Sequence, residues 1–330
     1  MKDLFHNVYE VIEENGRYCP TRFTQKQICS LDRINPSFAN NGRTSAGVSL
    51  VFDTDSEEIS FSYQYNVLYT TIGGFDVYEN GKFLYNQVLP ISSCEGTFRY
   101  RKETSGLTRL EIFLPANAQM WLWDFHLGNF SFVEQEKNKT ILFYGDSITQ
   151  SAYFPTPSLS FAPTVARKLS AKFINRGVGS LFYDVNSLDE NDTIHPDIIL
   201  IILGLNDLAK HQDGELVVVN DEVQFCDQQD IPYLIGNAEA YLGKMKQIYP
   251  NAEIFCVPLF WCPALKDDWA LSITDIYEER IRNLLKEMDI VCVEGCGLTP
   301  HLLECYAPDR IHHSALGAQA FANSILEYLA

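Results

Sequence analysis

Short apolar segments alternate with helix-like segments from Thr140 onward, and this alternation constrains the fold more than any other feature of the sequence. The apolar segments are rich in Ile, Val and Phe, which suits strands that are buried on both faces. We predict strands at Thr140–Tyr144, Lys172–Asn175, Asp197–Leu203, Glu253–Pro258 and Asp289–Val293. Because strands that alternate with helices form a parallel sheet between helix layers, this part of the chain is predicted to be a three-layer α/β/α domain.

The segments between these strands carry apolar residues at the spacing of three to four that marks amphipathic helices. They are Leu159–Ser170, Ala238–Tyr249, Ile273–Met288 and Ala315–Leu329. The segment Gly214–Asp230 interrupts the alternation and is predicted to contain an inserted hairpin.

The residues before the parallel sheet follow a different pattern. From about Arg22 to about Phe132, apolar and polar residues alternate at short intervals between turn signals such as Asn80-Gly81, a strong hairpin signal. Since no long helical period separates these runs, we predict an antiparallel β-sandwich. The polar, charged run Glu134–Lys139 is interpreted as a connector, which gives an N-terminal domain over 1–137 and a second domain over 138–330.

Charge and hydropathy exclude several partners. With 25 basic and 43 acidic residues, the net charge of −18 repels phosphate backbones and anionic lipids, so we expect no nucleic-acid partner. No apolar run reaches the roughly 20 residues of a membrane-spanning helix, and no secretion signal is visible at the N-terminus, so we also expect no membrane partner.

The nine cysteines are scattered, and several stand in apolar segments. They are interpreted as reduced, buried side chains, which favours a cytoplasmic location. Cys292, Cys296, His301 and Cys305 have spacings that loosely suit zinc, but no Cys-x-x-Cys pair anchors them. We therefore predict packing cysteines and no metal or organic cofactor.

Polar residues follow the ends of two predicted strands. Ser147 comes directly after the first strand and Asn206 after the third, so both lie at the carboxyl edge of the sheet, where such folds bind ligands. Asp309 and His312 precede the last helix, and their three-residue interval lets the carboxylate orient the imidazole toward a hydroxyl. This pattern predicts a charge-oriented base aimed at the serine.

These segments resemble the SGNH or GDSL hydrolase superfamily of serine esterases over roughly Thr140 to Ala330, whose catalytic domain is flavodoxin-like. The matching blocks are Gly145-Asp146-Ser147-Ile148-Thr149, Asn175-Arg176-Gly177-Val178-Gly179-Ser180, Gly204-Leu205-Asn206-Asp207 and Asp309-Arg310-Ile311-His312. The resemblance implies a Ser147 nucleophile, a His312 base and a supporting Asp309. It also implies an oxyanion hole made by the Ser147 N–H, the Asn206 amide and a second N–H, from either Gly179 or Ser180, because Ser180 stands at the usual glycine position.

The N-terminal runs 45–52 and 74–78 look like the jelly-roll-like β-domain of two-domain bacterial SGNH esterases, which are commonly carbohydrate O-acetyl esterases. This resemblance implies a small-molecule or oligosaccharide acetyl ester as substrate. Asp146 is predicted beside the substrate as a hydrogen-bonding residue rather than a second base. Trp261 is predicted to stack on a sugar ring. Core packing is the alternative use for Trp261 and for further aromatic candidates near strand ends, namely Tyr153, Phe154, Phe182, Tyr183, Phe260 and Trp269.

Two other functions stay open at this point. An SGNH thioesterase or lipid esterase fits the same motifs, although the net charge of −18 disfavours anionic substrates. A non-catalytic carbohydrate-binding protein is the alternative outside enzymes. The intact set of serine, asparagine, histidine and aspartate argues against it.

Overall fold

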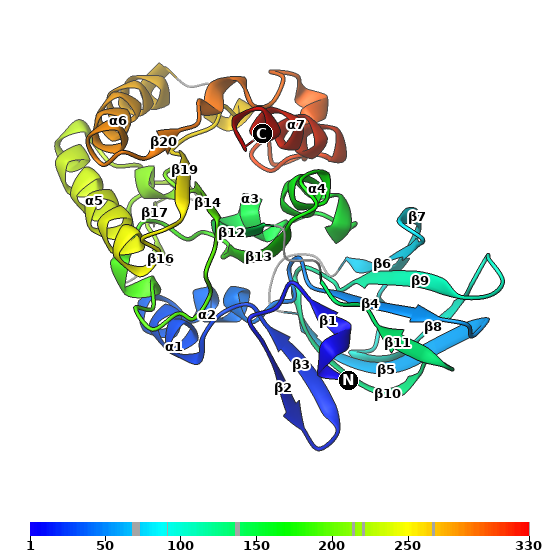
Figure 1. Ribbon diagram of the computed structural model, residues 1–330. Coiled ribbons are helices and arrows are strands. Elements are labelled where there is room, and N and C mark those ends of the chain that lie inside the picture. The colour runs from blue at the N-terminus through cyan, green and yellow to red at the C-terminus, as the bar shows by residue number, and fades with distance from the viewer. Residues whose placement is uncertain are drawn as a thin grey trace.

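A computed structural model describes residues 1–67, 73–90, 92–135, 139–212, 215–219, 222–265 and 268–329 (Figure 1). It consists of an α/β part that carries the C-terminus and an all-β part that carries the N-terminus. The predicted domain boundary between residues 137 and 138 lies outside the described residues.

A parallel five-stranded sheet forms the centre of the α/β part. Its order is β13-β12-β14-β19-β20, so the sheet's first strand in sequence order, β12, pairs with its second and third, β13 and β14, as in flavodoxin-like folds. The strands are β12 (Thr140–Gly145), β13 (Lys172–Gly177), β14 (Ile198–Ile202), β19 (Glu253–Val257) and β20 (Val291–Cys292). The predicted parallel sheet is confirmed.

Alternate residues of the central strands enter two separate cores, one on each face of the sheet. In β12, Leu142 and Tyr144 join a core covered by α5 (Ile231–Ile248) and α6 (Asp268–Glu287). Ile141 and Phe143 join the opposite core, which is covered by α4 (Phe161–Lys168) and α7 (Ala315–Leu329). The three-layer α/β/α architecture is therefore confirmed, and the short α3 (Ser147–Gln150) lies at the carboxyl edge of β12.

Two antiparallel sheets enclose a third core and form the predicted sandwich. The first has the order β1-β4-β9-β6-β7, with β11 paired to β4, and the second has the order β2-β3-β10-β5-β8. Their strands are β1 (Phe5–His6), β2 (Glu10–Glu14), β3 (Arg17–Thr21), β4 (Ser49–Thr54), β5 (Glu58–Val67), β6 (Gly74–Glu79), β7 (Lys82–Val88), β8 (Glu95–Arg101), β9 (Thr108–Phe113), β10 (Ala118–His126) and β11 (Phe130–Phe132). Inward-facing side chains such as Phe61, Phe75 and Phe98 fill the space between the sheets.

Two helices, α1 (Gln25–Ile34) and α2 (Pro36–Gly42), stand in the region that the sequence pattern assigned to strands. This detail of the prediction was wrong. Thr24 and Gln27 form a capping box that starts α1, and Pro36 stands in the first turn of α2. Both helices pack against the core of the α/β part rather than against the sandwich (Figure 1). This tertiary burial explains why such short segments form helices.

The predicted insertion consists of two small antiparallel ladders. β15 (His211–Gln212) pairs with β16 (Glu215–Leu216), and β17 (Val218–Val219) pairs with β18 (Glu222–Val223). No helix in the described ranges is both long enough and apolar enough to cross a membrane.

Candidate active site

Ser147 is the first residue of α3, directly beyond the carboxyl end of β12. Asp146 caps this helix, because its Oδ1 accepts a hydrogen bond of 2.9 Å from the Ile148 N–H. A side chain at Gly177, at the end of β13, would collide with the backbone of Gln150. The close approach of β13 to α3 therefore depends on Gly177. This approach brings the segment after β13 beside Ser147.

His312 joins Ser147 and Asp309 in a continuous hydrogen-bonded chain. Its Nε2 lies 2.7 Å from the Ser147 Oγ, and its Nδ1 lies 2.6 Å from the Asp309 Oδ2. The other carboxylate oxygen of Asp309 accepts hydrogen bonds from the N–H groups of Ile311 and His312 at 3.0 and 3.1 Å. The turn thus fixes its own carboxylate, and the structure brings the three predicted residues together.

The surroundings of His312 favour its neutral form. Burial lowers the pKa of His312 below its ordinary value, although the hydrogen bond and charge of Asp309 oppose this. Partial burial alone would raise the pKa of Asp309, but hydrogen bonds from Ile311 and His312 lower it overall. A neutral imidazole beside an ionised carboxylate has the protonation state that a general base needs.

The neighbouring His313 takes no part in the hydrogen bonds that join Ser147, His312 and Asp309. Its Nε2 lies 3.1 Å from the Thr299 Oγ1, and burial lowers its pKa to about 3. It is therefore a neutral, buried residue, which leaves His312 as the imidazole that faces Ser147.

The loop after β13 contains the two residues, Gly179 and Ser180, that are the alternatives for the second backbone donor. The Gly179 N–H donates to the Gln150 Oε1 at 2.6 Å, and the Gly179 carbonyl accepts from the Asn41 amide at 3.4 Å. Ser180 adopts a left-handed conformation with a φ of 63°. Among the described residues no acceptor bonds the Ser180 N–H. Of the two predicted alternatives, Ser180 is thus the residue whose N–H stays available.

Asn206 lies close to Asp146 at the same edge of the sheet. Its Nδ2 donates to the Asp146 Oδ2 at 3.1 Å and to the Leu181 carbonyl at 3.2 Å. Asp146 is 2% exposed, and burial raises its pKa to about 7. Both of its oxygens already have protein partners, so its predicted contact with substrate stays a prediction.

Trp261 is partly buried and packs on other side chains. Its ring stacks on His301 with the centroids 3.9 Å apart, and the Tyr306 hydroxyl donates to its carbonyl at 2.7 Å. Its contact with sugar stays a prediction. His301 itself lies near Cys296, and among the described residues no three potential ligands converge as a metal centre would require.

Two residues that hold the loop after β13 were missed by sequence reasoning. Gln150 lies at the end of α3 and Asn41 lies in α2, far from the loop in sequence. No motif marks an amide that bonds a remote backbone group.

Tyr153 was among the aromatic candidates, and its ring lies 4.6 Å from that of His312, with the side chain 39% exposed. It forms a side wall of the site next to the imidazole.

A serine, a histidine and an aspartate joined in this order at the carboxyl edge of an α/β sheet form the arrangement of serine hydrolases. The model of the GDSL-like lipase/acylhydrolase family matches residues 143–320, and the chain belongs to this family. It is a carboxylic ester hydrolase of the SGNH type. No curated protein matches the chain in sequence.

Solved structures resemble the whole two-part architecture. A salicylyl-acyltransferase from a tetracycline biosynthetic pathway has a TM-score of 0.79 at 16% identity, with 98% of this chain and 93% of that one covered. An acetyl xylan esterase from the rumen bacterium Butyrivibrio proteoclasticus has a TM-score of 0.64 at 15% identity, with 100% and 95% covered. A family two carbohydrate esterase from Clostridium thermocellum, in complex with cellohexaose, has a TM-score of 0.62 at 17% identity, with 87% and 92% covered. At these identities the likeness establishes the fold.

Proposed function

We propose that this protein is a serine esterase that removes acetyl groups from carbohydrate through an acyl-enzyme. The hydrogen-bonded chain Ser147–His312–Asp309, with links of 2.7 and 2.6 Å, is the observation that carries the proposal. The carbohydrate esterases among the similar structures support the substrate class, since they share both the catalytic fold and the N-terminal sandwich.

In the proposed mechanism, the neutral His312 removes the Ser147 proton as the Oγ attacks the ester carbonyl carbon. Asp309 stabilises the imidazolium that forms and holds its tautomer. His312 then gives the proton to the leaving sugar oxygen, the carbon–oxygen bond breaks, and the acetyl group stays on Ser147. A water molecule deprotonated by His312 then attacks the acetyl carbon. The bond from that carbon to the Ser147 Oγ breaks, His312 returns the proton to the Oγ, and acetate is released.

The negative charge on the carbonyl oxygen is stabilised by hydrogen-bond donors on the side opposite His312. We assign this role to the N–H groups of Ser147 and Ser180 and to the Asn206 amide. Since Asn206 donates to Asp146 and Leu181 in the free enzyme, the oxyanion takes one of those hydrogen bonds when it forms. Asp146 and Leu181 hold the amide at the site until then, so little reorganisation accompanies the reaction.

The test follows product release from acetylated xylo- and cello-oligosaccharides and from 4-nitrophenyl esters of increasing acyl length. The proposal predicts acetate release from the sugars and a preference for acetyl over longer esters. A preference for chains of eight or more carbons would favour the lipid esterase, and turnover of acyl thioesters alone would favour the thioesterase. Hydrolysis no faster than that of a Ser147→Ala control would favour the non-catalytic binding protein. Adding sugar acceptors shows whether the acyl-enzyme also transfers its group to alcohols.

We also propose that the protein acts in the cytoplasm. All nine cysteines are free thiols, as expected where thiols are kept reduced. The prediction that they are buried was wrong for Cys29, Cys94 and Cys296, which are exposed, and Cys292 is half-buried. Fractionation of the native cells tests this proposal, and recovery of the protein outside the cytoplasm would contradict it.

A further inference from the structure

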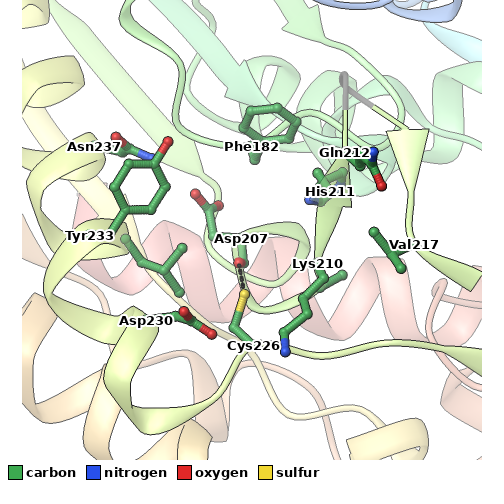
Figure 2. Close-up of a pocket in the computed structure, with 12 residues that line it drawn as sticks. Phe182, Asp207, Lys210, His211, Gln212, Val217, Cys226, Asp230, Tyr233 and Asn237 are labelled. Atoms are coloured by element: carbon green, nitrogen blue, oxygen red, sulfur yellow. Dashed lines mark hydrogen bonds between the residues drawn. The ribbon is translucent and has the colours of Figure 1, made fainter.

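A pocket of about 570 Å³ is lined by residues of the loop after β13, of the segment after β14 and of α5. Two of its lining residues, Phe182 and Asp207, come directly after Leu181 and Asn206 in the chain. Its far side is formed by Tyr233 and Asn237 on α5 (Figure 2). An acetyl group needs only a small part of this space, which has the size of a site for a whole small molecule.

The two segments that carry Ser180 and Asn206 are hydrogen-bonded to each other beside this pocket. The Asn206 amide donates to the Leu181 carbonyl at 3.2 Å, and the Tyr183 N–H donates to the Asp207 Oδ1 at 3.0 Å. These two bonds cross-link the loop after β13 to the segment after β14. A ligand in the pocket would therefore rest against the two segments that carry the proposed donors Ser180 and Asn206.

Two charged residues of the pocket, Lys210 and Asp230, have partners within the protein, and the Asp207 Oδ2 is buried without a partner among the described residues. Lys210 pairs with Asp227 at 3.1 Å, and the Asp230 Oδ2 accepts the Asp227 N–H at 2.7 Å. Among the described residues nothing bonds the side-chain amides of Asn237 and Gln212. What the pocket offers a ligand is thus a set of neutral donors and acceptors, which suits hydroxyl groups better than a phosphate or a carboxylate.

Aromatic surface accompanies these polar groups. The ring of Phe182 lies at one side of the pocket and that of Tyr233 at another (Figure 2). Tyr233 is 71% exposed, so most of its ring is available to a ligand. It stands four residues before Asn237, so the phenol and the amide share one face of α5. Aromatic faces with neighbouring amides form the kind of surface on which the apolar face of a sugar ring packs while its hydroxyls are hydrogen-bonded.

We propose that this pocket is a glycosyl subsite, which binds a neutral sugar residue of the same molecule whose acetyl ester reaches Ser147. The inference rests on the proposed carbohydrate esterase function and adds where the sugar binds. It assigns Phe182 and Tyr233 to contacts with the sugar ring, and Asn237 and Gln212 to its hydroxyls.

The experiment uses Tyr233→Ala and Asn237→Ala, because both residues lie on the side of α5 that lines the pocket and neither bonds Ser147, His312 or Asp309. For each protein kcat/KM is measured on an acetylated xylo-oligosaccharide and on 4-nitrophenyl acetate, and the ratio of the two is compared. We expect this ratio to fall about three- to tenfold in each variant, mainly through KM of the oligosaccharide. Tyr328→Ala and Asn323→Ala, matched exposed residues on α7, should keep the wild-type ratio.

A ratio that stays at the wild-type value in both pocket variants would overturn the subsite. A change in the preference between acetyl and longer acyl esters would overturn it as well, because it would assign the pocket to the acyl group. Calorimetric titration with unacetylated xylotriose and cellotriose separates this proposal from the proposed function. If the enzyme cleaves no sugar acetate but still binds these sugars, and Tyr233→Ala weakens that binding, the esterase proposal fails and the subsite stands. If neither sugar binds, the subsite is overturned.

Discussion

The two sides of the candidate active site are held by different kinds of contact. On the base side, Asp309 and His312 lie in one turn, and the backbone N–H groups of that same turn fix the carboxylate. On the other side, which carries the proposed oxyanion donors and is called the oxyanion side, both polar groups of Gly179 are held by side chains from other elements, Gln150 and Asn41. The base side is therefore organised locally, whereas the oxyanion side depends on the assembled fold.

The N-terminal part contributes to this dependence. Arg22 is fully buried and donates to the carbonyls of Asn175 at 2.5 Å and Gly177 at 3.1 Å, at the end of β13. It also donates to the carbonyls of Asn41 and Thr44, each at 2.7 Å. The guanidinium therefore links the helical segment after β3 to β13, the strand that leads into the loop with Gly179 and Ser180.

Loss of the base should have the largest effect. His312→Ala leaves Ser147 without a proton acceptor, and we expect kcat to fall by about 10⁵ to 10⁶. The double variant Ser147→Ala/His312→Ala should lose no more than either single variant, because the two residues act as a unit. Turnover of 4-nitrophenyl acetate measures this. Losses that simply multiply in the double variant would show that the two residues act separately.

The local carboxylate should rank second. Asp309→Asn keeps the shape of the turn but removes the charge that stabilises the imidazolium, and we expect kcat to fall by about 10³ to 10⁴. The thermal midpoint should change little, since Asp309 is partly exposed. A loss below tenfold would mean that the base side works without its carboxylate.

Removal of an oxyanion donor should rank third. Asn206→Ala is expected to lower kcat by about 10² to 10³, which corresponds to roughly 3 to 4 kcal/mol of transition-state stabilisation. KM should change much less than kcat, because the charge on the carbonyl oxygen develops only in the transition state. Near-normal turnover would remove Asn206 from the oxyanion hole.

The remote support of the oxyanion loop should have a smaller effect. Gln150→Ala removes the acceptor of the Gly179 N–H, and we expect kcat to fall about tenfold with KM little changed. This division between kcat and KM distinguishes lost positioning from lost substrate binding.

The two adjacent asparagines of α2 supply a matched control for this prediction. Asn41→Ala should lower kcat in the same direction as Gln150→Ala, because its amide reaches the Gly179 carbonyl. Asn40 is exposed, so Asn40→Ala should not lower it. Equal effects in the two variants would show that α2 acts through general stability.

The smallest effect concerns pH. The neutral form of His312 is the base, and its pKa is lowered, so the neutral form persists below the ordinary value of 6.5. We therefore expect kcat/KM on a non-ionisable ester to fall only as the pH drops below about 6.5. The pKa of Asp146 is raised to about 7, so this carboxyl group also titrates in the measured range. Asp146→Asn removes that titration and serves as the control. An inflection above pH 6.5 that persists in this variant would contradict the assignment to His312.

The parallel sheet and the base were predictable from the sequence because their signals are short-range. Runs such as Thr140–Tyr144 are apolar enough to be buried on both faces, and three residues separate Asp309 from His312. The helices α1 and α2 were not predictable in this way, because what stabilises them is burial against a core that lies more than a hundred residues later in the chain.

The choice between Gly179 and Ser180 shows the same limit. Either residue can donate its N–H, and nothing in the segment 175–180 distinguishes them. The amide of Gln150 decides between them by occupying the Gly179 N–H, and that contact exists only when α3 lies against the end of β13.

The sequence by itself determined the alternation of strands and helices, the edge of the sheet at which the polar residues gather, and the pairing of Asp309 with His312. Each of these follows from residue type and from spacings of a few positions. Tertiary structure alone decided which of the two backbone N–H groups is left without an acceptor, that Asn41 of α2 bonds the same loop, and that a pocket lies beside that loop. The reason is that a hydrogen bond between distant segments depends on where packing places them, to within a fraction of an ångström, and local sequence carries no record of that distance.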